Sequence, residues 1–278
     1  MNVVVAKSAG FCWGVRRAVE LARKTAASGA TPVYTDGPLI HNEHMMRRLR
    51  EAGVEECPDP AAIPAGATLI VRAHGISPER RRRLESLPIA VIDATRPDVA
   101  KIQRIGRQAA DGGATVLILG DPGHAEVVAL LGCAGPRGRV VTSPQDVEAL
   151  PSDLGNVCFV SQSTQPEAMF EATAAAVTRR FPGASIVNTI CHATRNRQGE
   201  LDSLAEDCDA FVVVGSPASA NTQRLAQLAS RLKPTVVVDS ADQLDPGDFA
   251  GVATVAVTAG ASTPDFLIEA VTARLQTF

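Results

Sequence analysis

Short β-branched and aliphatic runs alternate along the chain with longer segments in which apolar residues recur at helical spacing. The short runs predict strands, and the longer segments predict amphipathic helices. Because the two alternate from one end of the chain to the other, the pattern predicts an α/β fold of βαβ units with parallel strands. The expected strands are 2–6, 68–72, 89–93, 115–119, 157–161, 185–188, 210–214, 235–239 and 253–258, and the expected helices are 13–28, 42–52, 79–86, 97–111, 124–132, 166–180, 194–207, 219–231 and 264–276.

A weak internal repeat follows three of the expected strands, in segments that begin at Leu69, Val116 and Val212. Each is an apolar strand, then a Gly/Pro turn that carries His, Ser or Asn, then a helix. Ligands of α/β sheets bind at the carboxyl ends of strands, where helix N-termini also point. Segments 160–167 and 257–265 instead place small hydroxyl residues before a proline and an acid. These hydroxyls are interpreted either as helix N-caps or as ligands of a shared anion site.

Composition narrows the class of protein. The chain has 278 residues, of which 45% are hydrophobic and 4% aromatic, and a net charge of −3. Its length suits one large or two to three small α/β domains, and its charge argues against a nucleic-acid partner. The apolar start at 2–6 is too short for a secretory signal, and no apolar run approaches the ~20 residues of a membrane span. We therefore expect a cytoplasmic protein with no membrane partner.

The arginine run 80–83 is interpreted as a solvated helix face, with steering of an anionic substrate or docking of an acidic electron donor as the alternative.

The chain has six cysteines and no CxxC pair, so zinc-ribbon and ferredoxin spacings are excluded. Disulfides are not expected in a reducing compartment. Cys12 and Cys191 each lie between an expected strand and an expected helix. A helix N-terminus favours the thiolate form, so both are candidate metal ligands or nucleophiles. The other four are interpreted as buried or surface cysteines, although Cys133, nine residues after His124, could serve as a replacement thiolate.

Three of the five histidines lie at turn positions: His41, His74 and His124. A single histidine in such a place is usually structural or exposed. Three at equivalent strand ends indicate a polar cavity for a diphosphate, because imidazoles donate hydrogen bonds to phosphate oxygens and an anion favours their protonation. Glu126 is a candidate proton carrier. The alternative is a carboxylate in the first helical turn that complements the helix dipole.

Seven segments in chain order read SAGFCWGV, GPLIHNE, AHGIS, DATRP, GHAE, TICHAT and TAGASTPD. Together they resemble the 4-hydroxy-3-methylbut-2-enyl diphosphate reductase family (LytB/IspH), over nearly the whole chain. The resemblance implies three similar small α/β domains with parallel sheets in a pseudo-threefold arrangement around a central cavity. We place these domains at 14–96, 97–190 and 191–278, joined by an N-terminal strand at 1–13.

The resemblance also implies an activity. The family reductively removes an allylic hydroxyl from a diphosphate, using a four-iron (4Fe-4S) iron–sulfur cluster held by three cysteines. It implies a ferredoxin or flavodoxin type electron donor, a small anionic substrate and a monomer. Carried over by motif, the metal ligands are Cys12 and Cys191, the catalytic residues are Glu126, Thr164 and His124, and the substrate-binding residues are His41, His74, His124, Ser219, Asn221 and Ser262.

The third cysteine of that family falls on Arg96 in this sequence. A guanidinium has no free lone pair and stays protonated, so it cannot ligate iron. Three outcomes stay open: a cluster held by two cysteines and a substitute ligand, a smaller or labile cluster, or no cluster, with Arg96 as a new contact for the anionic substrate. Further departures from the family pattern are Asp98, Ala100, Gln103 and Ala220, together with an apolar stretch after Glu126.

These departures leave three functional hypotheses. The first is an iron–sulfur oxidoreductase that cleaves a C–O bond in an allylic diphosphate or related alcohol. The second is a divergent paralogue with a different, larger apolar or non-diphosphate substrate. The third is a cluster-free diphosphate-binding or regulatory protein, which the arginine at position 96 favours.

Overall fold

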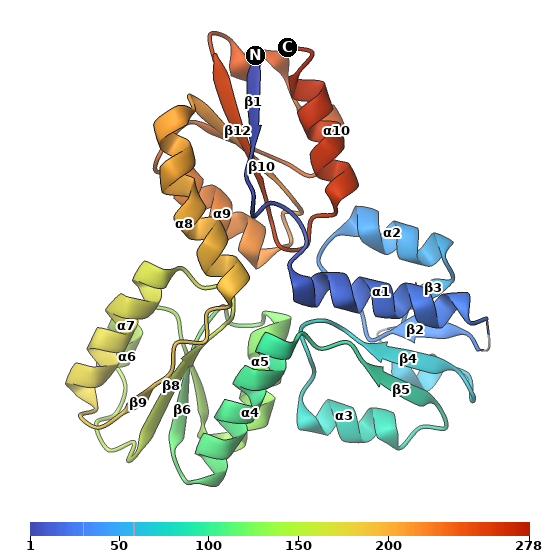
Figure 1. The fold of residues 1–278 in the computed structure, drawn as a ribbon. Helices are drawn as coiled ribbons and strands as arrows, with labels where there is room; N and C mark the ends of the chain where they lie inside the picture. Colours follow the sequence, from blue (N-terminus) through green and yellow to red (C-terminus); the bar gives the residue numbers. More distant parts are fainter. Residues whose placement is uncertain (30, 58) are drawn as a thin grey trace. The chain divides into compact units, whose positions relative to one another are not determined.

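The computed structural model describes residues 1–29, 31–57 and 59–278. These residues form three sheets, and every strand pairing in them is parallel, as the alternation of strands and helices predicts (Figure 1). Sheet A has the order β1 (Asn2–Val5), β12 (Thr254–Ala259), β10 (Ala210–Val214), β11 (Thr235–Val238); sheet B has β3 (Val54–Glu56), β2 (Val33–Thr35), β4 (Thr68–Val71), β5 (Ala90–Asp93); and sheet C has β7 (Gly138–Val141), β6 (Thr115–Leu119), β8 (Val157–Ser161), β9 (Ser185–Ile186).

Ten α-helices connect the strands in the described residues. They are α1 (Trp13–Ala27), α2 (Glu43–Glu51), α3 (Pro78–Glu85), α4 (Pro97–Asp111), α5 (Ala125–Ala134), α6 (Pro144–Glu148), α7 (Glu167–Arg180), α8 (His192–Asp207), α9 (Ala220–Ala229) and α10 (Asp265–Leu275). None of the helices in this part of the chain has the length and apolar character that a membrane span needs.

The chain divides into two compact units, which are described separately. Unit 1 comprises residues 1–16, 40–47 and 192–278 and contains sheet A, whereas unit 2 comprises residues 17–39 and 48–191 and contains sheets B and C. The three sheets and their helices confirm the predicted α/β class. The domain boundaries at 96/97 and 190/191 stay predictions.

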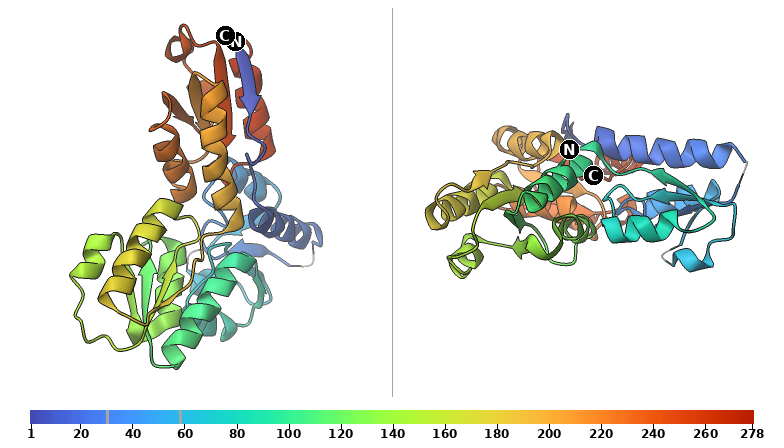
Figure 2. Two further views of the ribbon diagram at one scale, coloured as in Figure 1. Left: turned by 60° about the vertical axis from the view of Figure 1, so that its left-hand side comes forward. Right: turned by 90° about the horizontal axis from the view of Figure 1, so that it is seen from below.

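In unit 1, helices cover both faces of sheet A. Consecutive strand residues point to opposite faces, so the apolar strands offer each face a set of side chains to bury. Val212 and Val214 pack on the face that also buries Leu267 and Val271 of α10. Residues 211, 213 and 256 pack on the other face with α8 and α9. Met1 and Phe278 both pack against the α10 side, so the two chain ends lie at the same end of sheet A (Figure 2).

In unit 2, sheet C is also a layer between helices. Leu117 and Phe159 face α6 and α7, and Ile118 and Val160 face α4 and α5. One face of sheet B packs against α3, where Leu84 is fully buried. These layers place the ends of β5, β6, β8 and β9 and the starts of α4 and α5 within unit 2.

The hydrophobic pattern misses three strands and one helix. Strands β2, β3 and β7 and the five-residue helix α6 were not among the expected segments. A strand of three residues such as Val54–Glu56 is too short to show a period, and β7 contains Gly138 and Arg139 in its four residues. Parallel pairing to β2 and β6 supplies these strands with the backbone partners that their own sequences do not signal.

Two helix glycines give a matched test of packing between α5 and the loop before α3. A Cβ at Gly132 would lie 2.4 Å from the Ser77 Cβ, whereas a Cβ at Gly199 in α8 would meet nothing within 4 Å. Gly132→Ala should lower the free energy of unfolding by about 1–3 kcal/mol because the close contact must be pushed apart. Gly199→Ala should raise it by about 0.5–1 kcal/mol because alanine restricts the unfolded chain. Urea unfolding followed by circular dichroism measures both, and stabilisation by both variants would contradict the close approach.

Candidate functional site

In unit 2, three loops bring a charged cluster together at strand ends. Arg96 lies after β5 at the N-cap position of α4, Glu126 lies in the first turn of α5 after β6, and Ser163 follows β8. The backbone N–H of Arg96 donates to the carbonyl of Ala73 at 3.0 Å, which ties this loop to the loop that follows β4. The loop of Arg96 follows a strand of sheet B, and those of Glu126 and Ser163 follow neighbouring strands of sheet C, so the cluster lies at carboxyl ends of strands, where α/β proteins bind ligands.

Arg96 and Glu126 form a buried ion pair. The Nη2 of Arg96 donates to Oε2 of Glu126 at 2.6 Å and to Oγ of Ser163 at 3.1 Å. Glu126 is 0% exposed and Arg96 is 8% exposed. Ser163 donates its backbone N–H to Oε1 of Glu126 at 2.6 Å and its hydroxyl to Oε2 at 2.8 Å. Both carboxylate oxygens therefore accept hydrogen bonds, and the role of Glu126 as a proton carrier stays a prediction.

The same loops carry two more predicted site residues. The backbone N–H of Cys191 donates to the carbonyl of Ser163 at 2.9 Å, so the cysteine loop borders the ion pair. Thr164 is buried, and its Oγ1 accepts a hydrogen bond from Nε2 of Gln162 at 3.2 Å. Neither Ser163 nor Thr164 caps α7, whose N-cap position is Pro166 with no side-chain cap. The N-cap interpretation of these hydroxyls is therefore wrong.

His74 and His124 meet edge to face, with ring centroids 5.6 Å apart. His124 occupies the N-cap of α5, and its Nδ1 accepts a hydrogen bond from the backbone N–H of Glu126 at 3.2 Å. An Nδ1 that accepts a hydrogen bond leaves the ring proton on Nε2, so His124 presents an N–H donor. This geometry suits contact with an acceptor such as a phosphate oxygen.

Unit 1 holds the other predicted cysteine. Cys12 lies between β1 and α1, its backbone N–H donates to the carbonyl of Ala261 at 3.2 Å, and its Sγ accepts the N–H of Val15 at 3.4 Å. The thiol thus takes the place of a side-chain cap at the start of α1. Because β1 and β12 are neighbours in sheet A, the Cys12 loop lies beside the loop that carries Ser262.

Unit 1 also gathers the predicted diphosphate ligands. The Oγ of Ser262 lies 3.3 Å from the Oγ of Ser219 and donates to the carbonyl of His41 at 3.2 Å. Ser219 caps α9 by accepting from the N–H of Thr222. Asn221 is 8% exposed, and its Nδ2 is a buried donor with no acceptor among the residues that the structure describes. A donor left without a partner beside a helix N-terminus suits an anion that supplies the missing oxygen.

Two residues of α8 that sequence reasoning missed hold the Cys12 loop. Arg197 is buried and donates to the carbonyls of Gly10, Ala193 and Ala259. Glu200 accepts the backbone N–H groups of Lys7 at 2.7 Å and Ser8 at 3.0 Å, and the hydroxyl of Ser8. Burial opposes ionisation of Glu200, but these hydrogen bonds outweigh it and hold the pKa of Glu200 below its ordinary value. Nothing in the sequence distinguishes Arg197 and Glu200 from the other charged residues of α8, so their roles could not be predicted from it.

Comparison with known families matches residues 3–276 to the family described as LytB protein. This chain belongs to the LytB family. A relative from Opitutus terrae is 45% identical over 289 residues, with 99% of each chain covered, and one from Aquifex aeolicus is 37% identical over 99% of this chain and 96% of its own. Both are named 4-hydroxy-3-methylbut-2-enyl diphosphate reductase.

Solved structures agree with the family assignment. The reductase structure from Plasmodium falciparum, whose title names a hydroxymethylbutenyl diphosphate reductase, has a TM-score of 0.92 at 28% identity and covers 96% of this chain and 86% of its own. A second reductase structure, titled the terminal enzyme of the non-mevalonate pathway, has a TM-score of 0.74 at 36% identity over 100% of both chains. The relatives' names support a function of the LytB reductase type.

The residues do not fit the three-thiolate cluster that the LytB family implies. Position 96 carries a guanidinium that is already paired with Glu126. The Sγ of Cys133 lies 3.8 Å from Nη2 of Arg107, a residue whose backbone is about 16 Å from position 96 along the axis of α4, and a replacement thiolate at Cys133 stays a prediction. Burial raises the pKa of both Cys133 and Cys158, although Arg107 partly offsets this shift for Cys133. Cys158 lies among residues packed between α4, α5 and sheet C, and Cys133 is a buried residue of α5.

The buried pair can be tested by a double-mutant cycle. Arg96→Met should lower the free energy of unfolding by about 3–5 kcal/mol, because it leaves the Glu126 carboxylate buried without its cation. The double variant Arg96→Met/Glu126→Leu should recover most of that loss because no charge remains. The exposed pair of Arg179 and Glu148 is the matched control, and Arg179→Met should cost less than about 1 kcal/mol. A double variant as unstable as the sum of its single changes would contradict the coupling.

Glu200 gives a pH-dependent prediction for the Cys12 loop. Its folded pKa is depressed, so its contribution to stability is present above the unfolded pKa of about 4.3 and is lost as pH falls through the folded value. Glu200→Gln should therefore be less stable than the wild type by about 1 kcal/mol at pH 7. That difference should shrink toward zero as the pH is lowered toward 3. Urea unfolding across this range, with the exposed Glu206→Gln as control, measures it; a difference independent of pH would rule out the carboxylate's role.

Proposed function

We propose that this chain is a diphosphate-binding member of the LytB family in which an arginine–glutamate pair has replaced the third cluster thiolate. The buried ion pair between Arg96 and Glu126 carries this proposal. A family member that reduces its substrate through a three-thiolate cluster needs a sulfur at position 96 and a carboxyl that can deliver a proton. Here position 96 carries a guanidinium. The carboxylate of Glu126 accepts three hydrogen bonds, one from Arg96 and two from Ser163.

The support for diphosphate binding comes from unit 1. The N-terminus of α9 presents backbone N–H groups and the positive end of the helix dipole to an anion. Ser219 and Ser262 place two hydroxyls 3.3 Å apart beside it, and Asn221 adds an amide donor without a protein acceptor in the described residues. These groups bind and orient an organic diphosphate and need no redox centre to do so.

A second candidate is the iron–sulfur-dependent reductase that the relatives' names suggest, acting on an allylic diphosphate or a related alcohol. The retention of Cys12 and Cys191, each at a strand-to-helix loop, favours it. In this case a cluster would be held by those two thiolates and a ligand other than a cysteine at position 96. Its electrons would come from a ferredoxin or flavodoxin type donor.

One set of measurements separates the two candidates. Calorimetry with 4-hydroxy-3-methylbut-2-enyl diphosphate should show binding to the protein, weakened about tenfold or more in Asn221→Ala because a charge-assisted hydrogen bond is worth roughly 1.5–3 kcal/mol. The exposed Asn196 of α8 supplies the control variant Asn196→Ala, which should bind like the wild type. Absence of binding, or equal binding by the Asn221→Ala variant, would refute the diphosphate site.

Measurement of iron and labile sulfide in anaerobically prepared protein tests whether the chain holds an iron–sulfur cluster. We expect the wild type to hold less than one cluster per chain and Arg96→Cys to hold more, because the variant restores the sulfur donor. A full complement of iron and sulfide in the wild type, with turnover of the same diphosphate under dithionite and a viologen, would establish the second candidate instead.

A further inference from the structure

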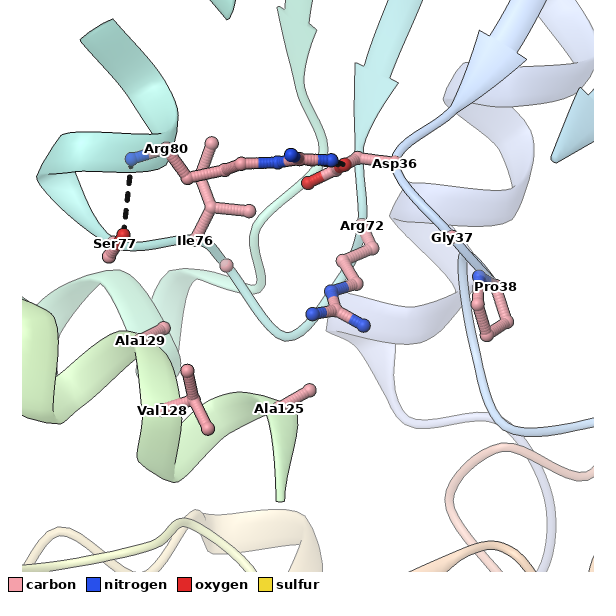
Figure 3. A pocket seen from close by; sticks show the side chains of 11 residues that line it. Asp36, Gly37, Pro38, Arg72, Ile76, Ser77, Arg80, Ala125, Val128 and Ala129 are labelled. Carbon is pink, nitrogen blue, oxygen red and sulfur yellow. Dashed lines mark hydrogen bonds and ion pairs between the residues drawn. The ribbon is translucent and has the colours of Figure 1, made fainter. Parts of the chain in front are cut away.

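Unit 2 contains a cavity of about 430 Å³ that includes none of the residues assigned above to substrate, cluster or proton transfer. It lies between the loops that follow β2 and β4 in sheet B and one face of α5 (Figure 3). This volume falls in the range of about 300–1,000 Å³ that is usual for small-molecule sites.

One wall of the cavity is apolar. Ala125, Val128 and Ala129 of α5 face Pro38 and Ile76 across it. Val128 is 49% exposed, whereas Val127 and Leu130 on the other face of α5 are buried. Val128 and Ala129 belong to the apolar stretch after Glu126 that departs from the family pattern.

The opposite wall carries positive charge. Arg72 extends from the loop after β4 toward Ala125, and Arg80 of α3 reaches Asp36 (Figure 3). Arg80 donates to Oδ1 of Asp36 through Nη2 at 2.5 Å and Nε at 3.2 Å. The positive charge of Arg80 is therefore balanced by the carboxylate of Asp36. The Nε of Arg72 is buried and finds no acceptor in the described part of the chain. Asp36, Arg72 and Arg80 together give the cavity lining a net charge of +1.

The surroundings of the Arg72 guanidinium favour the binding of an anion. Burial lowers the pKa of Arg72, attraction to Asp36 opposes this shift, and repulsion from Arg80 adds to it. A guanidinium removed from water is best stabilised by a bidentate acceptor, which a carboxylate or a phosphate supplies. An anion with a single head group would balance the net charge of the wall.

The structure fixes how far apart the two walls stand. Gly132 of α5 approaches Ser77 so closely that a Cβ there would lie 2.4 Å from the Ser77 Cβ. Ser77 is also the N-cap of α3 and lines the cavity. The contact holds α5 against the sheet B loops, so the cavity is a feature of packed elements and not of one loop's conformation.

We propose that this cavity binds an amphiphilic anion, with a single phosphate or carboxylate head on Arg72 and a short apolar chain against Ala125, Val128 and Ala129. Its lining residues are different from the diphosphate residues of unit 1, and its ligand differs from theirs in having one anionic head and an apolar tail. The two possible heads share the planar, bidentate recognition that a guanidinium offers.

Calorimetry of the full chain with four probes tests the proposal. Hexyl phosphate and hexanoate each combine a head and a tail, whereas inorganic phosphate and hexanol each supply one half. We expect one molecule of hexyl phosphate or hexanoate to bind per chain, and the tighter of the two identifies the preferred head. Inorganic phosphate and hexanol should bind at least tenfold more weakly, since each loses one wall of contacts.

Variants locate the binding. Arg72→Met should weaken binding about tenfold or more, which corresponds to about 1.4 kcal/mol, while Arg83→Met, an exposed arginine of α3 outside the cavity, should leave it unchanged. Val128→Glu should weaken it by charge repulsion and Val128→Gln much less; both changes lie at an exposed position that folding tolerates. Binding that is unaffected by Arg72→Met and Val128→Glu, or that Ser219→Ala weakens instead, would overturn the proposal, as would the absence of binding by both amphiphiles.

Discussion

The ion pair between Arg96 and Glu126 is the interaction on which the candidate site of unit 2 depends. Each charge would cost several kcal/mol if it were buried alone, so neither is tolerated without the other. Ser163 completes the arrangement, because its amide and hydroxyl occupy the remaining positions on the carboxylate. The pair therefore fixes three loops relative to one another: the one after β5, the one that begins α5 and the one after β8. The pair also places a cation at the position that the resemblance to the LytB family assigns to a cysteine.

Helix α5 links the two sites that the structure supports. Its first turn turns Glu126 inward to Arg96, and its outer residues Ala125 and Val128 form the apolar wall of the cavity beside Arg72. The periodicity of a helix makes this possible, because residues two positions apart face different sides. In both places an arginine on a loop lies beside α5. Arg96 pairs with the buried carboxylate of Glu126, and Arg72 lines the cavity. Unit 1 keeps Ser219, Asn221 and Ser262 but carries Ala220, so most of the departures from the family pattern lie in unit 2.

Hydrophobic patterning was enough for the elements that carry their own cores. The apolar runs of β4, β6, β8 and β10 were recognised because every residue in them is buried, and the helices began within two residues of the expected positions. Strands β2, β3 and β7 were missed because pairing with a neighbour, and not their own composition, makes them strands. Motif order likewise located Cys12, Cys191, His41 and Glu126 at strand ends, but the roles of Arg197 and Glu200 required knowing which loop faces α8.

By itself, the sequence determined the α/β class, the family, and the absence of a sulfur at position 96, because these depend on residue identity and local periodicity. The tertiary structure decided what that arginine does. Thirty residues of chain separate Arg96 from Glu126, and no spacing rule relates the side chains of one loop to those of another. Only the packing of α4 and α5 on sheet C brings guanidinium and carboxylate to 2.6 Å and excludes water from both. That packing turns a missing ligand into a buried ion pair.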